Sequence, residues 1–139
     1  MLRRLLVALT VAGLAVDAFV HFWLASTYDA VQGTVSQGTL FRVEALVAIL
    51  AAVLLLVRPG RLTAALAALV AGGGLVALVL YRYVDVGQIG PLPDMYEPLW
   101  YAKKSWTAVA QAVATAAAIT LVVLGPTAPA DVSPDASTG

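Results

Sequence analysis

An ionisable pair inside an apolar segment is the feature of this sequence with the clearest chemistry. Asp17 and His21 lie four residues apart within residues 10–23, where most other side chains are apolar or small. Residues at this spacing share one face of a helix, so the carboxylate and the imidazole can share a hydrogen bond. An aspartate inside a membrane costs about 2.5 to 3.5 kcal/mol on insertion scales, and it therefore tends to face protein or water. The pair predicts either a buried hydrogen-bonded network or a site that exchanges a proton.

Other polar residues are predicted to join this pair. With a rise of 1.5 Å per residue, and outer boundaries near residues 26 and 39, His21 and Glu44 lie roughly 7 to 8 Å deep. Arg42 and Glu44 are two residues apart and diverge by about 200°, so that when one faces the bundle the other tends away. Gln111 shares a helix face with Lys104 and adds an amide at a similar depth. The candidate ligand or proton site therefore comprises Asp17, His21, Arg42, Glu44, Lys104 and Gln111.

Residues 86–97 (VGQIGPLPDMYE) form a second region of interest. Two prolines and two glycines make this segment non-helical, and it is expected to be the longest external segment. All aromatic residues of the chain fall in the same half as this segment under the topology below. They indicate either interfacial anchoring or an aromatic-walled site for an apolar or planar ligand. The external candidates are Asp94, Tyr96, Glu97 and Trp100.

A metal site is not predicted. Cysteine is absent, and one histidine is a poor ligand set for zinc or copper. Haem would need a second axial ligand, for which only Met95 is available beside His21. The sequence contains no nucleophile elbow, P-loop or zinc-protease motif, and the cofactor, if there is one, stays unknown. An enzyme is therefore less favoured than a binding protein.

Composition indicates that the bilayer is the solvent of this chain. Of 139 residues, 61% are apolar and 12% are charged, whereas soluble domains carry about a quarter charged residues. Four apolar runs are each long enough to cross a hydrocarbon core of about 30 Å. We predict an all-α polytopic membrane protein, an up-down-up-down four-helix transmembrane bundle spanning residues 1–125. Its helices are expected at about 5–26, 39–57, 62–84 and 98–124. A zero formal net charge offers no basic surface for nucleic acid.

Orientation is predicted from the cations near the helix ends. Each side carries four, Arg3, Arg4, Arg58 and Arg61 on one and Arg42, Arg82, Lys103 and Lys104 on the other. The first helix begins with Arg3 and Arg4, and Arg42 sits within a helix, so the first side is assigned to the cytoplasm. The protein is expected in the cell membrane with both termini cytoplasmic. Residues 126–139 lack periodicity and are expected to form a disordered cytoplasmic tail.

Two classes of function are compatible with these features. A binding or accessory subunit would contact lipid, a larger membrane complex or another copy of itself, without turnover. An oxidoreductase-type or proton-coupled transport protein would use the polar cluster as a quinone, lipid or proton site. The first is favoured, because four helices show no inverted repeat and no cofactor motif.

The architecture resembles a known family. Four helices with cytoplasmic ends and a polar first helix, over residues 5–125, make the chain similar to DoxX-like small membrane proteins. The resemblance implies a four-helix membrane bundle, in some members linked to redox partners or quinone chemistry. The Asp17 and His21 pair and the proline-rich segment have no counterpart in that pattern.

Overall fold

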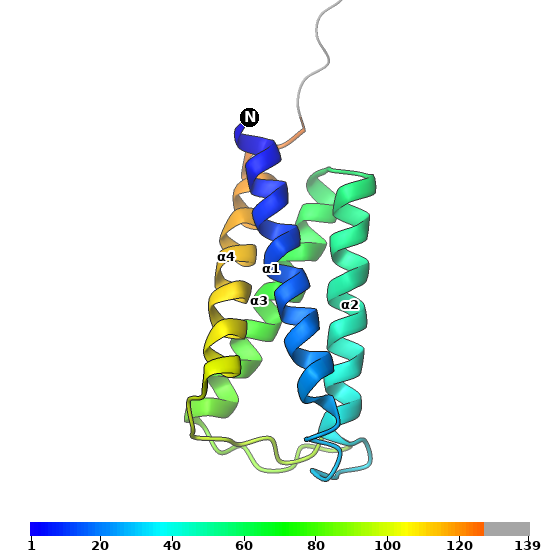
Figure 1. Ribbon diagram of the computed structural model, residues 1–139, viewed down its shortest axis with the longest axis vertical. Helices are drawn as coiled ribbons and strands as arrows, with labels where there is room; N and C mark the ends of the chain where they lie inside the picture. Colours follow the sequence, from blue (N-terminus) through cyan, green and yellow to red (C-terminus); the bar gives the residue numbers. More distant parts are fainter. Residues whose placement is uncertain (127–139) are drawn as a thin grey trace, which may run out of the picture.

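The computed structural model describes residues 1–126, which form four helices joined by loops (Figure 1). These are α1 (Leu2–Ala25), α2 (Gln37–Val57), α3 (Arg61–Tyr83) and α4 (Ala102–Leu124). Within residues 1–126 there is no β-strand, and one isolated bridge joins Ile89 to Leu92 in the last loop. The predicted disordered tail lies, from residue 127 onward, outside the described residues.

The helices form an antiparallel bundle. Each has 21 to 24 residues and is long and apolar enough to cross a membrane. Consecutive helices alternate in direction, so the N-terminus and the end of α4 lie at one end and the two longer loops lie at the other (Figure 1). Helix α1 packs against α2 and α4, and α3 packs against α4, while α2 and α3 touch less extensively. The predicted all-α, up-down-up-down four-helix fold is confirmed.

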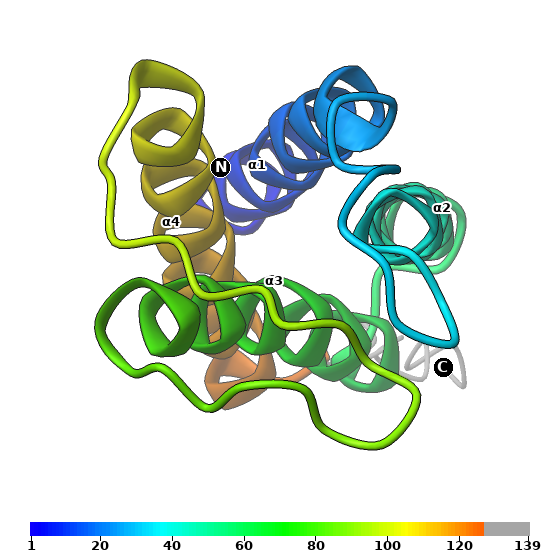
Figure 2. The same ribbon diagram turned by 90° about the horizontal axis from the view of Figure 1, so that it is seen from below.

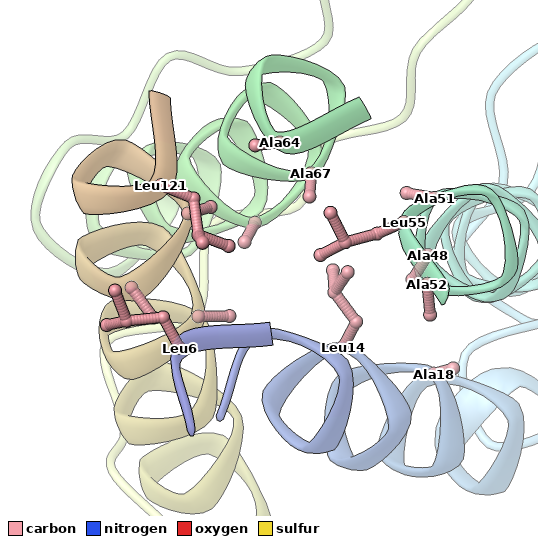
Figure 3. Packing of buried hydrophobic residues seen from close by; sticks show 14 of the residues in the cluster. Leu6, Leu14, Ala18, Ala48, Ala51, Ala52, Leu55, Ala64, Ala67 and Leu121 are labelled. Carbon is pink, nitrogen blue, oxygen red and sulfur yellow. The ribbon is translucent and has the colours of Figure 1, made fainter. Parts of the chain in front are cut away.

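Small residues line the interior of the bundle. Alanines recur at helical spacing on the inward faces of α2, α3 and α4, and Leu14 of α1 and Leu55 of α2 point toward each other among them (Figure 3). Small side chains allow helix backbones to approach closely, which is the usual packing mode of helices in lipid. Large apolar side chains lie instead on the outward faces, among them Leu50, Leu62 and Leu69.

Helices α1 and α4 approach each other closely at Gly13. A Cβ atom at Gly13 would lie 2.6 Å from the Ala110 carbonyl oxygen and 2.8 Å from the Ala114 Cβ. Thr10, one turn earlier, is fully buried, and its hydroxyl donates to the Leu6 carbonyl at 2.8 Å. This agrees with the prediction that the polar and small stripe of the first helix faces the other helices.

The start of α4 differs from the prediction. The helix was expected from Pro98 but begins at Ala102, with Tyr101 extended at the N-cap position. Tertiary contacts hold the preceding residues: the Glu97 N–H donates to the Tyr81 carbonyl at 3.0 Å, and the Lys104 ammonium donates to the carbonyls of Glu97 and Leu99. These bonds tie residues 97–99 to the ends of α3 and α4, and they outweigh the local preference of proline for a first helical turn.

Arginines cap the opposite end of α4. The Arg61 Nε donates to the Val122 carbonyl at 3.0 Å, and the Arg3 guanidinium donates to the Gly125 carbonyl. The last carbonyls of a helix have no partner within it and carry its negative dipole end, so cations are favourable there. These bonds fasten the starts of α1 and α3 to the end of α4.

Candidate functional site

The loop end of the bundle contains a cavity of about 580 Å³. It lies where α2 and α3 make their weaker contact, and it also reaches α1, α4 and the last loop. Its walls are mostly apolar, with Leu40, Phe41, Val76 and Tyr81 among the lining residues. The loop over residues 84–101 runs across this end of the bundle (Figure 2). A volume of this size is within the range of small-molecule sites in proteins.

The predicted Asp17 and His21 pair lies at one wall of the cavity, which His21 lines. The His21 Nδ1 lies 2.9 Å from the Asp17 Oδ1 and 2.9 Å from the Asp17 carbonyl oxygen. Asp17 is fully buried, and Gln111 of α4 donates its Nε2–H to the same carboxylate oxygen at 2.9 Å. The two side chains are therefore in contact, as their i, i+4 spacing predicts. Asp17 lies behind the cavity, whereas the His21 ring lines it.

Glu44 lines the cavity beside this network. A Cβ on Gly74 of α3 would collide with the Gln111 amide nitrogen and would lie 3.1 Å from the Glu44 Oε1. The absent side chain at Gly74 therefore leaves the space in which the Gln111 amide and the Glu44 carboxylate sit. Gly74 thus permits a close approach of α3 to Gln111 and Glu44. Gly73 differs, because a Cβ there meets nothing within 4 Å and projects into open space in the cavity wall.

Several buried polar atoms in this region lack a hydrogen-bond partner. They are the Asp17 Oδ2, the Glu44 Oε1, the Gln111 Oε1 and the Thr107 Oγ1. Buried polar atoms are nearly always paired, because an unpaired one costs about 1 to 3 kcal/mol. Three of these four are carboxylate or amide oxygens, which only accept hydrogen bonds. The region is thus rich in unused acceptors.

A second polar network closes the outer end of the cavity. The Tyr28 hydroxyl lies 2.8 and 2.9 Å from the two carboxylate oxygens of Glu97 and 3.0 Å from the Tyr101 hydroxyl. The Lys104 Nζ lies 3.1 Å from the Glu97 Oε2. Burial raises the pKa of Tyr28 well above its usual range, and its hydrogen bonds to Tyr101 and Glu97 add to the shift. Tyr28 therefore stays protonated and donates to Glu97.

Arg42 is not part of the inner cluster. Its guanidinium makes a two-pronged ion pair with Asp29 of the first loop, both contacts at 2.7 Å. The pair is about half exposed, and the hydrogen bond from Arg42 lowers the pKa of Asp29. The prediction that Arg42 and Glu44 face different ways is correct, and Glu44 is the one that faces the cavity. Arg42 instead fastens the first loop to α2.

Of the predicted external site residues, Glu97 lines the cavity, whereas Asp94 and Trp100 lie outside its wall. Glu97 lines the cavity, and its loop neighbours there are the apolar residues Leu92 and Met95. The Asp94 carboxylate accepts the Tyr96 N–H at 3.0 Å in an exposed turn. Trp100 lies outside the cavity wall, with the Arg82 guanidinium 5.6 Å from its ring.

Tyr28, Phe41 and Tyr101 were not predicted as individual site residues. Phe41 packs edge-on against the His21 ring, with 5.0 Å between ring centroids, and tilted against the Tyr28 ring, with 5.1 Å between centroids. The gathering of aromatics at this end was the signal available in the sequence. The pairing of Tyr28 with Glu97 joins two loops, so local spacing could not reveal it.

Comparison with known proteins assigns no family. No protein-family model, curated protein or solved structure matches the chain. Within the part of the chain that the structure describes, no group of three His, Asp or Glu side chains could hold a metal ion. The cavity and its two polar networks are therefore the basis on which function is proposed.

Proposed function

We propose that this chain is an integral membrane protein that binds an apolar or amphiphilic small molecule in the cavity between α2 and α3, without chemical turnover. The observation that carries the proposal is the cavity itself, with apolar walls and polar side chains gathered at Glu44, His21 and Lys104. Small-molecule sites typically combine predominantly apolar walls with a few polar groups that orient the ligand. The less extensive contact between α2 and α3 would allow a lipid-soluble ligand to enter the cavity laterally from the acyl chains.

Residence in the membrane is supported by the outer surface of the bundle. Large apolar side chains cover the outward faces of helices that are long enough to span the bilayer. In water such faces would form apolar patches far larger than soluble monomers expose. We expect these faces also to contact a larger membrane complex or a second copy of the chain. This contact and the resemblance to DoxX-like proteins stay predictions.

We place both termini in the cytoplasm of a cell-membrane protein. The first helix begins with Arg3 and Arg4, and Arg42 at the loop end lies within α2 rather than in a loop, so it weighs less in the orientation. We expect cysteines at Thr34 and Gln88 to react with an impermeant maleimide in intact cells and one at Gly60 to react only after lysis. The reverse labelling pattern would invert the orientation.

Filling the cavity tests the binding proposal. Gly73 lies in the wall, and a Cβ there meets nothing within 4 Å, so Gly73→Leu should add a side chain to the cavity without a clash at its Cβ. We expect a long-chain alcohol carrying a photoreactive diazirine to label cavity peptides of the wild type at least about fivefold more than those of Gly73→Leu. Labelled positions would be read by mass spectrometry after reconstitution.

Val79→Phe is the matched control for this experiment. It adds volume to the same helix at an outward position that does not line the cavity. Labelling of the cavity in this variant should equal that of the wild type. Equal labelling of the wild type and Gly73→Leu would show that the cavity does not take the probe and would refute the proposal.

A second candidate is a site that exchanges a proton or holds a quinone. It is favoured by one observation, an imidazole in the cavity wall whose Nδ1 lies 2.9 Å from a fully buried carboxylate oxygen. Such a pair can move a proton between the cavity and the protein interior. A quinone that co-purifies with the isolated protein would favour this candidate over binding alone.

A further inference from the structure

The charged groups of the cavity wall differ in whether they have hydrogen-bond and ion-pair partners. At the outer end, the Lys104 ammonium contacts the carbonyls of Glu97 and Leu99 at 2.9 and 3.0 Å and the Glu97 carboxylate at 3.1 Å. An ammonium has three N–H donors, so these contacts occupy all of them. The Glu97 carboxylate also accepts from Tyr28. This end of the cavity therefore presents a neutralised pair with no spare donor.

Glu44 presents the opposite situation. Its Oε1 is buried without a hydrogen-bond donor, and among the ion pairs of residues 1–126 it has no cationic partner. His21, the nearest titratable group of opposite sign, already directs its Nδ1 to Asp17. Behind the wall, the fully buried side chains of Asp17 and Gln111 each hold a further oxygen without a donor. Acceptors and negative charge are in excess around Glu44.

We propose that the cavity selects ligands whose polar head is a protonated amine, which pairs with Glu44 while the apolar body lies between α2 and α3. This inference rests on the proposed function and names its ligand class. A cationic donor forms charge-assisted hydrogen bonds with a carboxylate, which are roughly twice as strong as neutral ones. Rings of Phe41, Tyr81 and Tyr101 line the same cavity and offer faces that attract cations.

The groups around Glu44 favour a cation over an anion. Asp17 and His21 of α1 form a pair, Gln111 and Thr107 of α4 are uncharged, and the Lys104 and Glu97 pair is internally neutral. The carboxylate of Glu44 is thus the charge that remains uncompensated. An anionic head would meet it with no free cation in the wall, whereas an ammonium supplies both the missing charge and the missing donor.

Three photoreactive probes with the same diazirine-bearing alkyl chain test this inference. One ends in a primary amine, one in a hydroxyl and one in a methyl ether, and each is applied to the protein in vesicles of a neutral lipid at pH 7. Labelling of cavity peptides is compared with labelling of the outward face of α3, which corrects for different partition into the lipid. We expect the amine to label the wild-type cavity about ten- to hundredfold more efficiently than the ether.

The variants Glu44→Gln and Asp94→Asn complete the test. Glu44→Gln removes the charge with little change in shape, and the preference for the amine should fall to that of the hydroxyl probe. Asp94→Asn removes a carboxylate from an exposed turn outside the cavity and should keep the full preference. The ratio of amine to ether in the wild type tests the amine preference even when Glu44→Gln is poorly folded, and the variant tests whether Glu44 is the source of that preference.

The other outcomes separate the two proposals. Equal labelling of the wild-type cavity by all three probes would overturn the amine preference and leave the binding function standing. The same holds for an amine preference that Glu44→Gln keeps, because the charge of Glu44 would then not be its source. Absence of cavity labelling by every probe would overturn both.

Discussion

Replacing Gly13 with alanine is expected to separate α1 from α4 and to lower the free energy of unfolding by about 1 to 3 kcal/mol. The added methyl group would lie 2.6 Å from the Ala110 carbonyl oxygen, which is backbone and cannot rotate away. Relief requires one helix to move, and this movement would loosen the Gln111 contact with Asp17 one turn along the same interface. Unfolding of the protein in mixed detergent micelles by increasing fractions of SDS measures the change.

Gly73→Ala is the matched control for Gly13→Ala. It makes the same chemical change in a helix of similar length, but its methyl group meets nothing within 4 Å. Alanine is the better helix former, so this variant should match the wild type or gain up to about 0.5 to 1 kcal/mol. Equal stabilities for the two variants would show that close approach at Gly13 does not hold α1 to α4.

The helices and the inner pair could be predicted because they depend on local periodicity. Apolar runs of membrane-spanning length fix the number of helices, and the four-residue spacing of Asp17 and His21 fixes their shared face. The same reasoning showed that Arg42 and Glu44 must diverge. It could not say which of them faces inward, because that depends on Asp29, a partner in the loop that precedes α2.

Features that depend on contacts between distant segments could not be predicted. The late start of α4 follows from hydrogen bonds of residues 97–99 to Tyr81 and Lys104, not from the residues at the start itself. Tyr28 meets Glu97 across two loops, and this contact brings a first-loop residue into the site. The cavity itself lies where α2 packs less extensively against α3, and helical periodicity within each segment does not reveal this.

The two polar networks have different physical roles. Tyr28, Glu97, Tyr101 and Lys104 satisfy one another, so this outer network behaves as a structural closure of the loop end. The inner network of Asp17, His21, Gln111 and Glu44 retains unpaired oxygens. Fully paired networks stabilise one arrangement, whereas unpaired buried acceptors cost free energy unless a ligand or water supplies donors. This contrast is the reason why we propose ligand recognition at the inner end of the cavity.

Replacing Asp17 with alanine is expected to lower the free energy of unfolding by about 1 to 3 kcal/mol. The change leaves the buried Gln111 Nε2 and the His21 Nδ1 without the carboxylate oxygen that both now contact at 2.9 Å. Asp17→Asn keeps an oxygen that can accept from Gln111, and it should lose less than about 1 kcal/mol. Asp85→Asn, in the exposed loop that follows α3, should stay within about 0.5 kcal/mol of the wild type.

Ligand binding across pH separates the structural role of Asp17 from a role in proton exchange. Asp17→Asn preserves shape, but its amide does not exchange a proton near neutral pH, so a hydrated proton site would lose its pH dependence in this variant while remaining folded. His21→Gln removes the titratable partner of Asp17, and it should likewise abolish the pH dependence of a proton site while the protein remains folded. The measurement pairs SDS unfolding with amine-probe labelling between pH 5 and pH 8, a range that spans the unperturbed pKa of histidine at about 6.5. Wild-type stability and wild-type labelling at every pH in both variants would show that the pair is incidental to stability and to binding.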